Sequence, residues 1–198
     1  MQNIVIVNTG CANISSVRFA LERLGVRVTV SAEHDVIQRA DKVFLPGVGT
    51  ASAAMRSIGE KNLTATLQQL QQPVLGICLG MQLMVASSEE SRTGDIPCLS
   101  LMPGQVKKLN ANGKRLPHMG WNTVTHTNSP LFKGIDQHSY FYFVHSFAVP
   151  DYPQTLARCD YGSTFSAAIG KDNFMGVQFH PERSGDAGAQ LLTNFVNL

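Results

Sequence analysis

Residues 74–80 read Val-Leu-Gly-Ile-Cys-Leu-Gly, a short apolar run that ends in a cysteine set between two glycines. The apolar part is typical of a buried strand, and a helix is predicted to follow it. Gly76, Cys78 and Gly80 have the spacing of the G-x-S-x-G nucleophile elbow, with cysteine in place of serine. Glycines suit both flanking positions because strand and helix pass close together at such a turn. The stretch therefore predicts a strand, a sharp turn that carries a thiol, and a helix.

Strand-like and helix-like patterns alternate on both sides of this stretch. Short β-rich runs are followed by segments whose apolar residues recur at spacings of three and four, which is typical of βαβ units around a parallel sheet. The predicted strands are 4–7, 26–30, 43–45 and 74–77, and the predicted helices are 14–24, 63–70 and 79–85.

The pattern changes beyond Ser87, where strand-like runs follow one another without helices between them. These runs indicate an antiparallel or mixed extension of the sheet, followed by a last strand and a closing helix. We therefore predict one α/β domain over residues 1–198, with a mostly parallel central sheet and an antiparallel extension. The strands of the second half are predicted at 106–109, 140–144, 155–159, 165–169 and 173–179, and the helix at 187–195.

Composition excludes several classes of protein. The chain has 198 residues, of which 43% are hydrophobic and only 15% charged, so extended disorder is excluded. The net charge is +2 with scattered basic residues, which argues against nucleic acid as a ligand. There is no apolar run of about 20 residues and no leader-like start, so we expect a cytoplasmic protein without a membrane partner. The four cysteines form no C-x-x-C pair, and neither a metal nor another cofactor is expected.

Cys78 is the candidate nucleophile, because the start of a helix favours negative charge on its sulfur. A thiolate needs a base, and the base needs a group that orients it. His180 and Glu182 of Phe179-His-Pro-Glu182 fit these roles, since residues i and i+2 of an extended segment project to the same side. The alternatives are an ordinary buried cysteine, a strand-end histidine and a helix-start carboxylate.

Acyl transfer also needs donors aimed at the developing oxyanion. The N–H of Leu79, directly after the nucleophile, is one candidate. The glycine-rich turn of residues 46–49, Pro-Gly-Val-Gly, is another, because its backbone can approach a ligand closely. A tight turn without a ligand is the alternative interpretation.

Three segments taken together resemble the signatures of the class I, or triad, glutamine amidotransferases. They are Leu45-Pro-Gly-Val-Gly49, Gly76-Ile-Cys-Leu-Gly-Met-Gln82 and Val177-Gln-Phe-His-Pro-Glu182. A narrower resemblance, to the glutaminase subunits of imidazole glycerol phosphate synthase in histidine biosynthesis, rests on Asn13 with Ser16-Val17, on residues 117–121 (Pro-His-Met-Gly-Trp) and on residues 140–146 (Tyr-Phe-Tyr-Phe-Val-His-Ser). Arg183 departs from the family pattern, in which lysine is frequent after the triad glutamate.

The resemblance implies a three-layer, flavodoxin-like fold and glutamine as the substrate. Cys78 would attack the side-chain amide, His180 would protonate the leaving ammonia, and water would hydrolyse the γ-glutamyl thioester to glutamate. Glu182 would complete the triad, and the oxyanion donors would lie at Gly49 and Leu79. The implied substrate contacts are Gly47, Val48, Gln82, Glu90 for the α-ammonium group, His145, Ser146 and Phe147.

The resemblance also implies a partner, a separate (β/α)₈ cyclase subunit that uses the ammonia to make imidazole glycerol phosphate and AICAR. Ammonia becomes ammonium in bulk water and loses its nucleophilicity, so it has to travel along a secluded path. Residues 117–121 are the candidate docking loop, with Pro117, Met119 and Trp121 at the interface. A core tryptophan beside a turn is the alternative for Trp121.

Three other functions stay open at this point. A glutaminase subunit for another pathway, such as anthranilate or pyridoxal phosphate synthesis, shares the three signatures, but Val48 and residues 117–121 favour the histidine pathway. A cysteine peptidase or DJ-1-like hydrolase shares the elbow, without accounting for Gln82 and the turn of residues 46–49. A non-catalytic binding module is disfavoured by Cys78 and the His-Pro-Glu segment.

Overall fold

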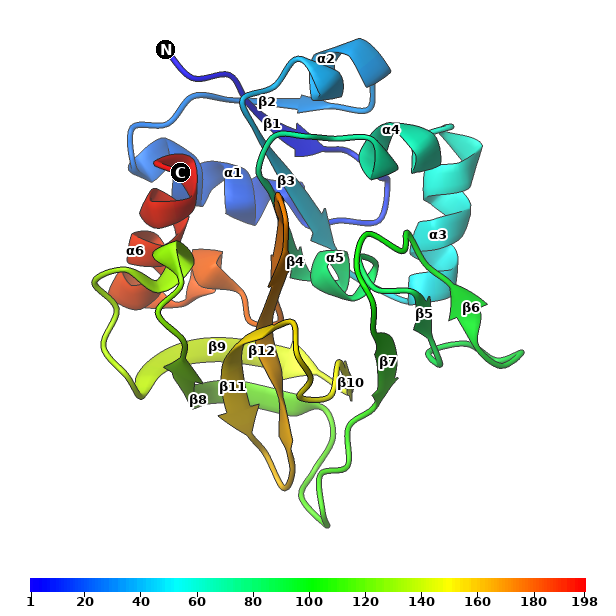
Figure 1. Ribbon diagram of the computed structural model, residues 1–198, viewed down its shortest axis with the longest axis vertical. Coiled ribbons are helices and arrows are strands. Elements are labelled where there is room, and N and C mark those ends of the chain that lie inside the picture. Colours follow the sequence, from blue (N-terminus) through cyan, green and yellow to red (C-terminus); the bar gives the residue numbers. More distant parts are fainter.

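A nine-stranded sheet runs through the computed structural model, which describes residues 1–198 (Figure 1). Its first five strands pair in parallel, and the remaining four pair antiparallel. The predicted α/β fold with a parallel sheet and an antiparallel extension is therefore confirmed. In order across the sheet, the strands are β2 (Val28–Ser31), β1 (Ile4–Val7), β3 (Lys42–Gly47), β4 (Val74–Cys78), β13 (Phe174–Val177), β12 (Thr164–Lys171), β11 (Thr155–Asp160), β8 (His118–His126) and β9 (Ser139–His145).

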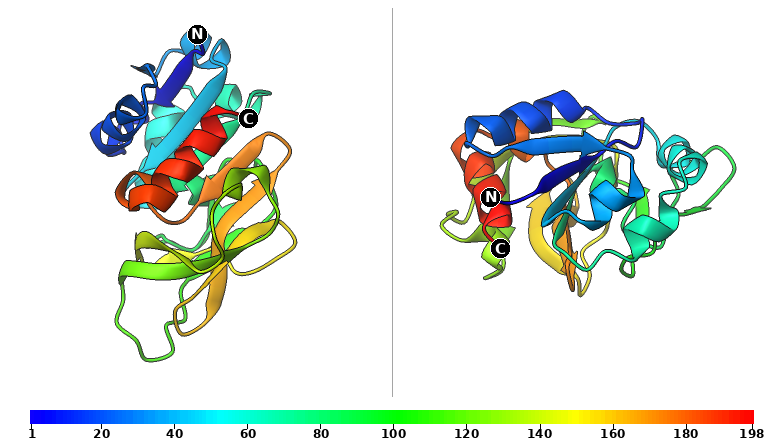
Figure 2. Two further views of the ribbon diagram at one scale, coloured as in Figure 1. Left: turned by 90° about the vertical axis from the view of Figure 1, so that its left-hand side faces the viewer. Right: turned by 90° about the horizontal axis from the view of Figure 1, so that it is seen from above.

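Helices cover both faces of the parallel part and make three layers (Figure 2). On one face lie α1 (Ile14–Arg23) and α6 (Gly185–Val196), and on the other lie α2 (His34–Gln38), α3 (Ala51–Glu60) and α4 (Thr64–Gln68). The short helix α5 (Leu79–Gln82) follows β4, and two 3₁₀ turns, η1 (Pro130–Phe132) and η2 (Pro181–Arg183), complete the helical elements.

The apolar strands explain why both faces are covered. Ile4 and Ile6 of β1 pack in the hydrophobic cluster under α1 and α6, whereas Val5 and Val7 pack in the cluster under α2, α3 and α4. A parallel strand buried on both faces has a continuous apolar sequence, which is why these runs show no alternation. At about 25 cal/mol per Å² of buried apolar surface, the two clusters supply the main stabilisation of the fold.

A second, smaller sheet lies beside the carboxyl ends of the parallel strands (Figure 1). It places the segment around residues 88–90 on one side of β7 and the segment around residue 147 on the other, although the two are far apart in the chain. Its strands, in order, are β10 (Phe147–Ala148), β7 (Gln105–Lys108), β5 (Ser87–Ser88) and β6 (Ile96–Pro97).

The helix after Cys78 is shorter than predicted, because long-range hydrogen bonds end it. Instead of reaching Val85, α5 ends at Gln82. The Met84 N–H donates to the Met81 carbonyl oxygen only three residues back, and the Ala86 N–H donates to the distant Gly104 carbonyl oxygen at 3.0 Å, so the helical pattern stops. An apolar run alone could not reveal this competition.

The predicted docking loop at residues 117–121 is wrong as a loop. Residues 118–121 open strand β8, which pairs with β9 along its length and with β11 near its end. Polar residues and Gly120 hid the strand from the sequence pattern. The alternative of a core tryptophan is also wrong, since Trp121 is 55% exposed.

No helix in the structure combines the length and the apolar character needed to span a membrane.

The turn from β4 to α5 leaves no room for side chains at its two glycines. A Cβ on Gly80 would lie 1.7 Å from the carbonyl oxygen of Leu45, at the end of β3. A Cβ on Gly76 would lie 2.8 Å from the backbone of Gly80 and Met81. Backbone therefore packs directly on backbone where β3, β4 and α5 meet.

We predict that Gly80→Ala lowers the free energy of unfolding by about 3 kcal/mol or more, because strand β3 or helix α5 has to move. Gly59→Ala is the matched control, since its Cβ would meet nothing within 4 Å in α3, and it should stabilise by about 0.4 to 1 kcal/mol. Urea unfolding of both variants measures the difference. Equal stability of the two variants would contradict the close-contact explanation.

Candidate active site

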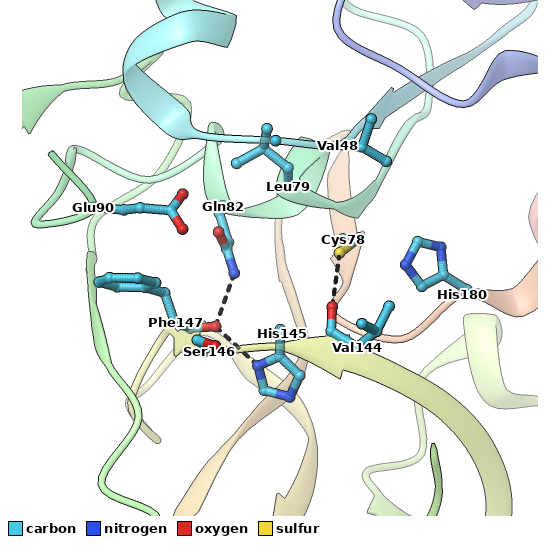
Figure 3. Close-up of a pocket in the computed structure, with 11 residues that line it drawn as sticks. Val48, Cys78, Leu79, Gln82, Glu90, Val144, His145, Ser146, Phe147 and His180 are labelled. Atoms are coloured by element: carbon cyan, nitrogen blue, oxygen red, sulfur yellow. Dashed lines mark hydrogen bonds between the residues drawn. The ribbon is translucent and has the colours of Figure 1, made fainter. Parts of the chain in front are cut away.

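Cys78 stands at the junction of β4 and α5 in a conformation that L-residues rarely adopt. Its φ is 56° and its ψ is −112°, so the backbone is in the left-handed half of conformational space. Such strain persists only where the surrounding structure enforces it. The sulfur faces a pocket, where it donates a weak hydrogen bond to the carbonyl oxygen of Val144 at 3.9 Å (Figure 3).

His180 comes to the same pocket from the strand next to β4. The parallel register pairs Val177 with Ile77, so the chain leaves β13 beside Cys78. The His180 N–H donates to the carbonyl oxygen of Tyr142 in β9 at 2.9 Å, and Pro181 begins η2. The imidazole then lies beside the sulfur, at the same end of the pocket (Figure 3).

Glu182 orients the His180 ring from behind. Its Oε1 lies 2.6 Å from His180 Nδ1, and both side chains are buried. A carboxylate oxygen can only accept, so Nδ1 carries a proton and the Nε2 edge is left for the pocket. The structure therefore brings Cys78, His180 and Glu182 together, as the spacing of the His-Pro-Glu segment predicts.

The surroundings of His180 favour its positive charge. Burial by itself opposes that charge, but the hydrogen bonds and negative charges of Cys78 and Glu182 outweigh burial and raise the pKa of the imidazole well above its usual range. The His180 ring can thus keep a second proton at neutral pH.

A cavity of about 250 Å³ joins most of the predicted site residues. Nine residues are predicted as substrate contacts or oxyanion donors, and all of them except Gly47 line this cavity. Gly47 does not, because its backbone packs on α5, where a Cβ would lie 3.0 Å from the Gly80 nitrogen. The lining consists of Val48, Gly49, Cys78, Leu79, Gln82, Glu90, Val144, His145, Ser146, Phe147 and His180.

The two ends of the pocket differ in chemistry. Cys78 and His180 occupy one end, and the carboxylate of Glu90 enters at the other (Figure 3). Glu90 Oε1 accepts a hydrogen bond from the Ala51 N–H at 3.1 Å. Burial raises the pKa of Glu90, although the bond from Ala51 works in the opposite direction. A cationic group at that end would therefore meet a partly buried carboxylate.

The turn of residues 46–49 has one backbone donor directed away from the pocket. The Val48 N–H donates to the carbonyl oxygen of Cys11 at 3.0 Å, and the Gly49 φ of +92° places it in the left-handed region. The Leu79 N–H belongs to the first turn of α5, where N–H groups have no partner within the helix. The pocket thus adjoins the free N–H group of Leu79 and the turn of residues 46–49, which Cys11 holds through Val48.

Val144 and Gln178 are site residues that the sequence reasoning missed. Val144 faces the sulfur through its carbonyl group, and Gln178 donates from Nε2 to Cys78 Sγ at 3.7 Å. Gln178 could have been found, because it lies two residues before His180 on the same side of an extended segment. Nothing in the local sequence marks Val144.

A chain of buried histidines supports the floor of the pocket. Asn122 Nδ2 lies 3.1 Å from His118 Nε2, and His118 Nδ1 lies 2.8 Å from His145 Nε2. His145 Nδ1 lies 2.9 Å from the carbonyl oxygen of Phe147. A carbonyl only accepts, so each ring is a neutral donor at Nδ1 and an acceptor at Nε2.

Burial keeps both rings neutral. It lowers the pKa of His118 to about 4, with help from the charge of Lys114. It lowers the pKa of His145 to about 3, although the bond to Phe147 works against it. No group of three or more histidine, cysteine, aspartate or glutamate side chains is arranged to hold a metal ion.

The residues predicted for the interface lie on an exposed face of β8 and β9. Pro117 and Met119 are exposed, as is Trp121, whose ring packs edge-to-face on Tyr142 with centroids 6.0 Å apart. The Arg183 guanidinium lies over the same Tyr142 ring at 5.2 Å. This face adjoins the pocket, since Val144 pairs with Met119 in the ladder.

Comparison with known proteins agrees with this geometry. The family model described as glutamine amidotransferase class-I matches residues 5–198. The protein named imidazole glycerol phosphate synthase subunit HisH of Colwellia psychrerythraea is 56% identical, over 98% of this chain and 92% of its own length. The protein of the same name from Photobacterium profundum is 55% identical, over 100% of this chain and 98% of its own.

Solved structures share the fold. The structure of PurLQS from Thermotoga maritima matches with a TM-score of 0.74 at 18% identity, over 100% of this chain and 99% of that one. A crystal structure described as glutamine amidotransferase matches with a TM-score of 0.75 at 15% identity, over 98% of this chain and 97% of that one. The chain thus belongs to the class-I glutamine amidotransferases and, among them, to the family of the HisH subunits.

The neutral histidines predict how stability depends on pH. Below about pH 6.5 the unfolded chain protonates His118 and His145, whereas the folded chain does not until about pH 4 and 3. The free energy of unfolding should therefore fall as the pH falls between 6.5 and 4. His118→Gln removes one of the two rings that take up a proton on unfolding. The change in the free energy of unfolding with pH should therefore become smaller, by up to about 1.4 kcal/mol per pH unit. Urea unfolding across this range gives both slopes, and identical slopes would mean that His118 is protonated in the folded protein.

Proposed function

We propose that this chain is the glutaminase subunit of imidazole glycerol phosphate synthase, which hydrolyses glutamine and delivers ammonia to a cyclase subunit. The observation that carries the proposal is the meeting of Cys78, His180 and Glu182 at one end of a pocket in a class-I glutamine amidotransferase. Relatives that are 55% and 56% identical along nearly the whole chain support the particular pathway.

In the proposed reaction, the Cys78 thiolate attacks the side-chain carbonyl carbon of glutamine, and its electron pair forms the C–S bond. The carbonyl oxygen becomes an oxyanion, which the N–H groups at Leu79 and Gly49 would stabilise. The His180 imidazolium gives its proton to the amide nitrogen as the C–N bond breaks and ammonia leaves. His180 then takes a proton from water, and the hydroxide attacks the γ-glutamyl thioester. The C–S bond breaks, glutamate is released, and the Cys78 thiolate and the His180 imidazolium are restored.

The two ends of the pocket suit the two ends of glutamine. With the amide at Cys78, the α-ammonium group would reach Glu90, whose partly buried carboxylate suits a cation. Val48, Gln82 and residues 145–147 would contact the rest of the molecule. Gly47 is better described as a support, because its contact is with α5.

The partner is proposed to be a (β/α)₈ cyclase subunit, docked on the exposed aromatic face of β8 and β9. Aromatic side chains such as Trp121 dominate interface energetics. The face adjoins the pocket, so ammonia could pass to a docked subunit without entering bulk water. We further propose that residues 1–198 act as one domain, since the large sheet joins both halves of the chain, and that the enzyme works in the cytoplasm.

We predict that Cys78→Ala abolishes glutamine hydrolysis and leaves binding of the cyclase subunit intact, because the sulfur is the nucleophile and is buried, outside the exposed docking face. Glutamate release and a binding titration measure the two properties. Cys98→Ala, which removes a buried thiol outside the pocket, is the control and should stay active. Hydrolysis by the Cys78 variant would remove the nucleophile assignment.

The turn of residues 46–49 predicts activation by the partner. Because Cys11 holds the Val48 N–H away from the pocket, we expect slow hydrolysis by the chain alone. A rotation of this turn would add a donor to the oxyanion site, which typically raises kcat by about 100-fold or more. Glutamate release should therefore rise by about that factor when the cyclase and its nucleotide are added. Equal rates with and without them would exclude the switch.

A further inference from the structure

Gln178 is a completely buried amide with a contact to the nucleophile, yet it neither lines the pocket nor belongs to the triad. Its Nε2 lies 3.7 Å from Cys78 Sγ, and its Oε1 lies 2.8 Å from Gln82 Nε2. It therefore links the sulfur to a residue that lines the pocket.

A backbone carbonyl fixes which end of this amide faces the sulfur. The Phe147 oxygen can only accept, and it accepts from Gln82 Nε2 at 2.9 Å and from His145 Nδ1 at 2.9 Å. Gln82 uses its second N–H on Gln178 Oε1, so both hydrogens of its amide are engaged. With Oε1 occupied in this way, Gln178 has to present its N–H group to Cys78.

Besides His180, the sulfur has two polar neighbours, Val144 and Gln178, and these suit its two protonation states. A thiol S–H can donate to the Val144 carbonyl oxygen, as it does here. A thiolate cannot donate, and the same carbonyl then repels it, whereas the N–H of Gln178 attracts it. Ionisation should therefore strengthen the contact with Gln178 and weaken the contact with Val144.

We propose that Gln178 is a positioning residue: its N–H holds the Cys78 thiolate in the orientation for attack, and Gln82 with the Phe147 carbonyl fixes the direction of that N–H. The inference rests on the proposed glutaminase function, which it deepens. Gln178 acts only through the sulfur and takes no part in bond making or breaking.

The first experiment uses Gln178→Met, which keeps the length of the side chain and removes both polar atoms. Alkylation by iodoacetamide at pH 7, followed by mass spectrometry, reports the reactivity of Cys78, with the half-exposed Cys11 as an internal reference. We expect alkylation of Cys78 to slow about tenfold relative to Cys11, the change that loss of one hydrogen bond to a charged group brings. Gln69→Met, at an exposed position, is the matched control and should match the unaltered protein.

The second experiment separates positioning from a general loss of structure. Gln178→Glu keeps an acceptor for Gln82 but replaces the donor that faces the sulfur. In the complex with the cyclase, kcat for glutamine hydrolysis should fall about tenfold, while KM stays within about twofold. Its alkylation rate, relative to that of the unaltered protein, should fall from pH 6 to pH 9 as the new carboxyl ionises and repels the thiolate.

The outcomes distinguish this inference from the proposed function. If the unaltered complex releases no glutamate, the glutaminase proposal fails, and alkylation still tests the role of Gln178. If the unaltered complex is active and Gln178→Met keeps both its kcat and its Cys78 alkylation rate, positioning by Gln178 is wrong. Should Gln178→Met fail to fold, Gln178→Glu decides, and a rate ratio near one throughout the pH range overturns the proposal.

Discussion

The contact between the backbone of α5 and the end of β3 is the constraint on which the site depends. Gly80 sits so close to the Leu45 carbonyl that only hydrogen fits between them. The chain has to turn sharply to enter α5 at that distance, and Cys78 takes up the turn in a left-handed conformation. The same approach brings residues 46–49 beside the first turn of α5. One packing contact thus sets both the direction of the thiol and the place of the glycine-rich turn.

The last parallel strand, β13, and the antiparallel extension together supply the remaining chemistry. Because β13 is the parallel neighbour of β4, the chain that leaves it delivers Gln178 and His180 to the side of Cys78. Strand β9 fixes the segment through the Tyr142 carbonyl and ends in the residues that form the pocket floor. The extension is therefore part of the site as well as a cover for the core.

Local patterns predict this protein well where local contacts decide the structure. The elbow of residues 76–80 and the His-Pro-Glu segment are recognisable because steric and hydrogen-bonding needs act within a few residues. The early end of α5 was not predictable, since the Ala86 N–H pairs with the carbonyl oxygen of Gly104, far along the chain, instead of continuing the helix. Strand β8 was not predicted because only His118 and Val124 among its residues are fully buried, so its apolar pattern is weak. Val144 escaped because its carbonyl, rather than its side chain, faces the sulfur.

The buried polar groups of this site fix one another's donor and acceptor orientation, in addition to completing one another's hydrogen bonds. An amide such as Gln178 has nearly the same shape in its two orientations, but one offers the sulfur a donor and the other an acceptor. The Phe147 carbonyl can only accept, so it fixes the orientation of the Gln82 amide. The Gln82 N–H group in turn fixes the orientation of the Gln178 amide. Apolar residues in these places would be easier to bury, yet they could neither orient the nucleophile nor distinguish its two charge states. Orienting the nucleophile therefore requires these buried polar groups. The apolar clusters that stabilise the rest of the fold offset the free energy that their desolvation costs.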